Sequence, residues 1–98
     1  MPILMQKVHN ISIILVDLDR ATTLVAESFK NNVLSEIASD SKMFIFDLTE
    51  CEFIDSTFLS ALVTSYKRIV ENGGELKMEG LRPSVDSMFK LTRVSKTY

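Results

Sequence analysis

The chain has 98 residues, a length that predicts one globular domain over residues 1–98, with a core that needs no disulfide or metal. Its composition, 46% hydrophobic and 24% charged, is typical of a folded soluble protein and excludes a disordered one. The net charge of −2, with 11 basic residues scattered along the sequence, argues against nucleic-acid binding, which requires a concentrated basic face.

The single cysteine and the single histidine exclude two kinds of stabilising site. A single cysteine, Cys51, cannot form an internal disulfide, and a single histidine, His9, leaves no zinc-type ligand set. We therefore expect no metal, no cofactor and a reducing cytoplasmic location. No apolar segment reaches the length of a signal peptide or the roughly 18 residues of a membrane span, so export and membrane insertion are not expected.

The first third of the chain predicts two strands and a helix. Residues 11–16 are short and β-branched, and residues 3–9 form a plausible antiparallel edge partner across a turn at His9-Asn10. Between residues 23 and 39 the apolar positions recur at steps of three and four. They are Ala26, Phe29, Val33 and Ile37. This spacing predicts an amphipathic helix with one buried stripe.

The middle of the chain predicts a central strand and a second helix. Residues 43–48 are almost continuously apolar, a pattern that favours a strand at the centre of its sheet with helices on both faces. From Ser56 onward one side of a helical wheel is apolar. The inward positions are Leu59, Leu62, Val63, Tyr66, Ile69 and Val70. Gly73 and Gly74 are expected to end this helix with a left-handed residue.

The last third predicts a short strand and a third helix. Residues 75–78 read as the strand, Gly80 as a turn, and Pro83 as the first turn of a helix whose apolar positions include Val85 and Phe89. Residues 94–98 are too short to assign. Four basic residues make the C-terminal end of the sequence locally basic: Arg82, Lys90, Arg93 and Lys96. We interpret them as a solvated face rather than a site for an acidic partner. Alternating strands and helices predict an α/β fold with a mixed or largely parallel sheet.

The chemistry-bearing residues gather where two predicted strands end. They are Asp17, Asp19, Asp47, Glu50, Glu52 and Asp55, followed by the hydroxyls of Ser56 and Thr57. Two interpretations stay open: turn acids with a helix cap, or a binding edge of an α/β sheet. Ser56 has neither a base nor an oxyanion hole, and three glycines cannot build a phosphate-binding loop, so we expect no enzyme.

Several separated segments resemble one known family. Residues 47–57 resemble the central motif of STAS domains, the family of bacterial anti-sigma factor antagonists, and residues 72–76, 80–85 and 88–92 continue the likeness in the same order. The resemblance covers roughly residues 10–98 and is stronger in the second half. It implies a single STAS-type α/β domain, with a mixed four- to five-stranded sheet and three to four helices packed mainly on one face.

The resemblance also implies a function. In that family the serine after the motif aspartate, here Ser56, is phosphorylated by a serine kinase of the Bergerat ATPase fold that doubles as an anti-sigma factor. The unphosphorylated domain binds the kinase, phosphorylation releases it, and a metal-dependent serine phosphatase restores it. The implied partner-binding residues are Asp19, Asp55, Ser56, Thr57 and Phe58.

Three positions depart from the family pattern. Phe58 replaces a glycine usual two residues after the phosphorylated serine, and it is either a core residue, which we favour, or an aromatic partner contact. Arg93 replaces a glycine after the last helix. Matching Asp19 to the family's early aspartate requires about three extra residues, so its contact role is open.

The sequence therefore leaves two functions of different classes. The first is a regulatory protein of partner switching and transcription control that is phosphorylated on Ser56. The alternative is a STAS subunit that is not phosphorylated and serves as a structural part of a transporter or a larger signalling assembly.

Overall fold

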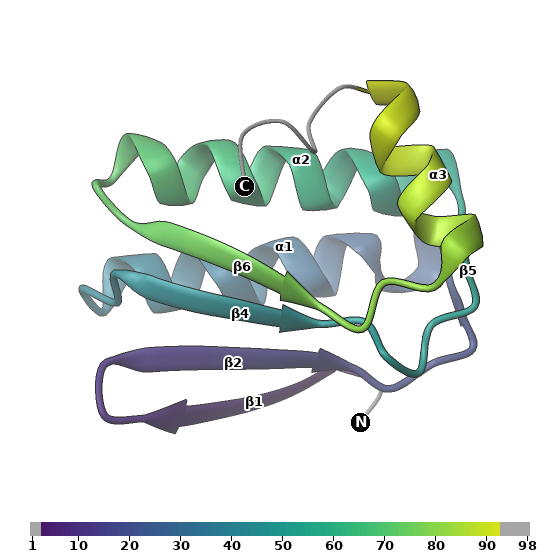
Figure 1. Cartoon of the computed structure of the whole chain (residues 1–98). Helices are drawn as coiled ribbons and strands as arrows, with labels where there is room; N and C mark the ends of the chain where they lie inside the picture. The colour runs from purple at the N-terminus through teal and green to yellow at the C-terminus, as the bar shows by residue number, and fades with distance from the viewer. Residues whose placement is uncertain (1–2, 93–98) are drawn as a thin grey trace.

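A computed structural model describes residues 3–92 and arranges them as two sheets and three helices (Figure 1). The strands are β1 (Ile3–Val8), β2 (Ile11–Val16), β3 (Arg20–Ala21), β4 (Met43–Asp47), β5 (Phe53–Ile54) and β6 (Glu75–Glu79). The helices are α1 (Thr23–Ala38), α2 (Ser56–Glu71) and α3 (Pro83–Thr92). The expected α/β class with a mixed sheet is confirmed.

The main sheet has the strand order β1-β2-β4-β6. β1 pairs antiparallel with β2, and the expected turn is present, with His9 in the left-handed region at φ 56°. β2, β4 and β6 run parallel, so β4 is internal, as predicted. Parallel neighbours need crossover connections, which α1 and α2 provide.

Burial along the central strands alternates, which corrects the expectation of helices on both faces. Phe44 and Phe46 are fully buried under the helices, whereas Met43 is 38% exposed and Ile45 is half-buried on the opposite face. Figure 1 shows α1 and α2 on the same side of the sheet. The apolar run predicts a strand correctly, but only one face of that strand is fully buried.

Three phenylalanine rings join the two long helices to the sheet. The ring centroid of Phe29 in α1 lies 5.0 Å from that of Phe46 in β4 and 5.2 Å from that of Phe58 in α2. All three side chains are fully buried. Edge-on and tilted aromatic pairs at these distances add to the stabilisation from burial. The first turn of α2 is therefore anchored in the core through Phe58.

The predicted inward side of α2 is correct except at its end. Leu59, Leu62 and Ile69 are buried, but Val70 is 48% exposed and Ser65 is fully buried instead. The helix is rotated so that the line through Leu62, Ser65 and Ile69 faces the core, and this rotation carries Val70 toward solvent.

The ends of α2 and α3 follow the predicted signals. Gly73, at φ 78°, takes the left-handed conformation after α2, and its N–H donates to the carbonyl of Val70. Pro83 begins α3, whose Val85 and Phe89 are buried. None of the helices within residues 3–92 is long and apolar enough to cross a membrane.

Of the four basic residues named for the C-terminal end of the sequence, Arg82 and Lys90 lie in the described part of the chain, and both are paired at the surface. Arg82 lies 3.5 Å from Glu52, and Lys90 lies 3.1 Å from Asp86. These exposed pairs agree with the interpretation of a solvated face. Arg93, Lys96 and the unassigned segment 94–98 lie outside the described residues.

One element was not expected from the sequence. β3 and β5, each two residues long, form a separate parallel sheet in which Arg20 pairs with Phe53 and Ala21 with Ile54. This small sheet connects the segment that leads into α1 to the segment that leads into α2.

Candidate functional site

The segment between β4 and α2 begins with a turn that is closed by hydrogen bonds to the Asp47 side chain. The Oδ1 atom of Asp47 accepts hydrogen bonds from the backbone N–H of Thr49 at 3.0 Å and from its hydroxyl at 2.6 Å. The N–H of Cys51 then donates to the carbonyl of Leu48. Cys51 is buried, and this burial raises the pKa of its thiol. The two hydrogen bonds from Thr49 thus give Asp47 a structural role in the turn.

The segment from β6 into α3 braces this turn from the side. The N–H of Leu48 donates to the carbonyl of Glu79, and the Nε atom of Arg82 donates to the carbonyl of Thr49 at 3.1 Å. The hydroxyl of Ser84 donates to the carbonyl of Glu52 at 2.7 Å. The backbone that leads to Asp55 is thus held by one backbone and two side-chain hydrogen bonds from a segment about 30 residues away in sequence.

Asp55 caps α2 and also holds the start of α1. Its Oδ1 atom accepts the N–H of Phe58 at 2.8 Å, and its Oδ2 atom accepts the N–H of Thr23 at 3.0 Å and the Thr23 hydroxyl at 3.3 Å. Thr22, the residue before α1, makes no side-chain cap of its own. One carboxylate therefore accepts hydrogen bonds from backbone N–H groups in the first turns of both long helices, where such groups have no partner within the helix.

These hydrogen bonds stabilise the ionised carboxylate. The N–H of Phe58 is the main cause that holds the pKa of Asp55 below its ordinary value of 3.8, and the donors on Thr23 add to it. The positive end of each helix favours the same charge. Asp55 is accordingly an anion at neutral pH, directly before the candidate phosphorylation residue.

Ser56 and Thr57 are the first two residues of α2, and both are exposed. We call Asp55, Ser56 and Thr57 the switch site. The Ser56 hydroxyl makes no hydrogen bond to another residue of the described chain. The Ser56 side chain is therefore not committed to a structural bond among the described residues, whereas the Asp55 side chain is.

The structure brings Asp19 to the same end of the molecule. Its side chain is exposed, and its carbonyl accepts hydrogen bonds from the N–H of Glu52 at 2.8 Å and of Phe53 at 3.0 Å. Of the two readings of Phe58, the structure supports the core one, because its side chain has no exposed surface. We therefore leave Phe58 out of the surface that a partner could contact.

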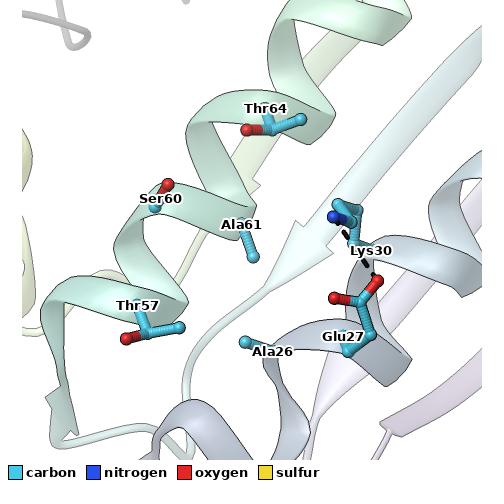
Figure 2. A pocket seen from close by; sticks show the side chains of 7 residues that line it. All are labelled: Ala26, Glu27, Lys30, Thr57, Ser60, Ala61 and Thr64. Carbon is cyan, nitrogen blue, oxygen red and sulfur yellow. Dashed lines mark ion pairs between the residues drawn. The ribbon is translucent and has the colours of Figure 1, made fainter.

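A shallow groove that the sequence did not indicate lies between α1 and α2, and it shares Thr57 with the switch site. Figure 2 shows hydroxyl-bearing side chains of α2 on one side and an ion pair of α1, Lys30 to Glu27, on the other. The charged atoms of this ion pair are 3.4 Å apart. Its volume is about 140 Å³. Small-molecule sites usually occupy several hundred Å³, so this groove is small for a bound metabolite. Within residues 3–92 no group of side chains could hold a metal ion.

The comparisons with known proteins agree with this architecture. The family model described as "STAS domain" matches residues 3–98, so the chain belongs to the STAS domain family. An anti-sigma-factor antagonist (STAS) domain protein from Planctomyces limnophilus superposes with a TM-score of 0.84 at 20% identity, over 98% of this chain and 86% of that one.

Two further solved structures show the same fold. An anti-sigma factor antagonist from Mycobacterium paratuberculosis has a TM-score of 0.83 at 20% identity, over 98% of this chain and 80% of that one. The Bacillus cell fate determinant SpoIIAA in its phosphorylated form has a TM-score of 0.81 at 10% identity, over 96% and 86%. At such identities the likeness establishes the fold.

The double role of Asp55 leads to a pH-dependent prediction. Because its pKa is lowered in the folded state, Asp55 stabilises the fold above its unfolded pKa, and this stabilisation is lost as the pH falls through the folded pKa. We expect Asp55→Asn to lower the thermal midpoint near neutral pH and the difference from wild type to shrink below about pH 4. Thermal unfolding followed by circular dichroism checks this.

Asp17→Asn is the matched control, since Asp17 is exposed on the same edge and makes no hydrogen bond to a described residue. Its thermal midpoint should follow that of wild type at every pH. A difference between Asp55→Asn and wild type that stays constant from about pH 7 to about pH 3 would show that the charge of Asp55 is irrelevant to folding.

Proposed function

We propose that the protein is an anti-sigma factor antagonist that works as a partner switch through phosphorylation of Ser56. The observation that carries this proposal is an unengaged, exposed hydroxyl at the first position of α2, directly after a capping aspartate, in a STAS domain. In its unphosphorylated form the domain binds a serine kinase of the Bergerat ATPase fold. It acts in the cytoplasm, and a metal-dependent serine phosphatase returns it to the binding form.

The geometry of the first turn supports a switch that acts by local charge. A phosphate on Ser56 adds about −1.5 to −2 charges at neutral pH, one residue from the ionised Asp55. The N–H of Phe58 already donates to Asp55, so that donor is not free for the phosphate. Two neighbouring anions are tolerated while water solvates them, and they are costly once an interface removes that water.

The fold itself is expected to persist in both states. Phe58 holds the first turn of α2 in the core through its contact with Phe29, and the dipole of α2 favours negative charge at this end. The phosphorylated and unphosphorylated forms then differ at the surface alone. A binding module whose only chemical event is carried out by other proteins needs no catalytic residues, and we therefore propose that the protein is not an enzyme.

The decisive experiment titrates wild type, Ser56→Ala and Ser56→Glu against each purified Bergerat-fold serine kinase encoded by the source genome. For the cognate kinase we expect Ser56→Ala to bind like wild type and to take up no phosphate. We expect Ser56→Glu to bind about 100-fold more weakly, because its carboxylate must be desolvated beside Asp55. Calorimetry measures the affinities, and mass spectrometry of the peptide that holds residues 53–60 locates the phosphate.

Thr57→Ala is the matched control, because Thr57 is the neighbouring exposed hydroxyl. Thr57 is also an implied partner contact, so the comparison concerns the modification alone: this variant should still be phosphorylated on Ser56 and released by that phosphate. If every kinase binds the Ser56 variants with equal affinity and no phosphate reaches Ser56, the switch is refuted. The alternative, a structural subunit of a transporter or larger assembly, then gains support.

A further inference from the structure

Three exposed side chains lie on the two segments that lead into the switch site. Leu24 in the first turn of α1 is 92% exposed, and Phe53 in β5 is 37% exposed. The guanidinium carbon of Arg20 in β3 lies 4.2 Å from the centre of the Phe53 ring. We call Arg20, Leu24 and Phe53 the outer patch.

The backbone places the outer patch on the solvent side of these segments. In the small sheet Ala21 and Ile54 are fully buried, so their neighbours Arg20 and Phe53 point the opposite way. In α1 the buried stripe begins at Ala26, and Leu24 lies on the other side of the helix.

The hydrogen bonds of Asp55 connect this patch to the switch site. Asp55 follows Phe53 by two residues and accepts the N–H of Thr23, the residue directly before Leu24. Asp55, the residue before Ser56, is therefore linked to Phe53 along the chain and to the start of α1, which carries Leu24, by a hydrogen bond. The two segments that carry the patch thus meet at Asp55, and we expect a protein surface that covers Ser56 to extend over them.

The chemistry of the patch favours binding to a protein surface. Arg20 and Phe53 restrict each other's conformations through a cation–π contact, which reduces the ordering that binding requires. Arg20 is exposed and takes part in none of the ion pairs of the described chain. Aromatic and arginine side chains are enriched among the residues that contribute most to interfaces.

We propose that the outer patch is the surface by which the domain recognises its kinase. This inference rests on the function proposed above and assigns the affinity of that complex to residues outside the switch site. The kinase is expected to present an apolar pocket for Leu24 and Phe53 with a carboxylate at its edge for Arg20. Phe53, rather than the buried Phe58, is then the aromatic contact of this chain.

The test uses the purified kinase that distinguishes Ser56→Ala from Ser56→Glu. We expect Leu24→Ser and Phe53→Ala each to weaken binding by about tenfold or more, as loss of an interface anchor does. Arg20→Gln should weaken it less and should reduce the dependence of affinity on salt concentration. Phosphorylation of Ser56 should slow in each variant through a higher KM with little change in kcat.

Val70→Ser is the matched control, since Val70 is an exposed apolar residue in the last turn of α2, far from the patch along the helix. It should leave the affinity unchanged. If the Ser56 variants behave as proposed while all patch variants bind within twofold of wild type, the patch is refuted and the switch stands. If no kinase distinguishes the Ser56 variants, both proposals fall. Circular dichroism confirms that each variant is folded.

Discussion

Phe58→Ala is expected to destabilise the fold by about 3–5 kcal/mol, a large part of the total stability of a small domain. The substitution empties a fully buried site and removes the ring contact with Phe29, whose centroid lies 5.2 Å away. The cavity would open between α1 and α2 directly below the switch site, where little can move in to fill it. Urea unfolding followed by circular dichroism gives the free energy of unfolding.

Phe53→Ala provides the matched control for this prediction. Phe53 is the same residue type five positions earlier, but it is 37% exposed, so its truncation should destabilise the fold by only about 1–2 kcal/mol. The two variants should therefore separate stability from binding, with Phe58→Ala affecting mainly the first and Phe53→Ala mainly the second. A loss below about 1 kcal/mol for Phe58→Ala would contradict its assignment to the core.

Phe58 stands where the STAS resemblance implies a glycine, and its side chain adds nothing to the exposed surface. A glycine two residues after the serine leaves no side chain to pack, whereas here an aromatic ring fills the space between Phe29 and the sheet. Glycine is unfavourable within a helix, and its replacement favours a well-ordered first turn. A rigid first turn suits a switch in which phosphorylation changes charge rather than conformation.

Local signals in the sequence predicted most of the fold. The periodic apolar positions of α1 and α2, the glycine after α2 and the proline at the start of α3 all depend on interactions within a few residues. The residues that determine each of these features lie next to one another in the sequence. The capping role of Asp55 was predicted in the same way, because an aspartate directly before the first helical residue is a local capping pattern. Phosphorylation of Ser56 stays a prediction.

The features that the sequence did not reveal all depend on contacts between distant segments. β3 and β5 are each two residues long and pair across 33 positions, so neither has a detectable period. The bond from Thr23 to Asp55 requires that same pairing. The orientation of Phe58, at the border of the apolar side of α2, could be decided only by the position of α1.

Gly80→Ala is expected to destabilise the fold by about 2–5 kcal/mol, through backbone strain and a direct clash. Gly80 has φ 72°, and a Cβ atom there would lie 2.7 Å from the Cα atom of Thr49 and overlap its side-chain oxygen. Because Thr49 belongs to the turn closed by Asp47, relief would require moving the segment that leads to Asp55. The variant should therefore also weaken binding at the switch site.

Gly73→Ala separates the two causes. Gly73 has nearly the same conformation, φ 78°, but no atom lies within 4 Å of the added Cβ, so this variant carries the strain alone, about 1–2 kcal/mol. Denaturant unfolding of both variants gives the cost of the clash as the difference. Equal losses of unfolding free energy in the two variants would mean that the turn at Thr49 moves away from the added Cβ atom at little cost. The segment between β4 and α2 would then be too loosely held to position Ser56, and the support that β6 and α3 give to the switch site would have to be abandoned.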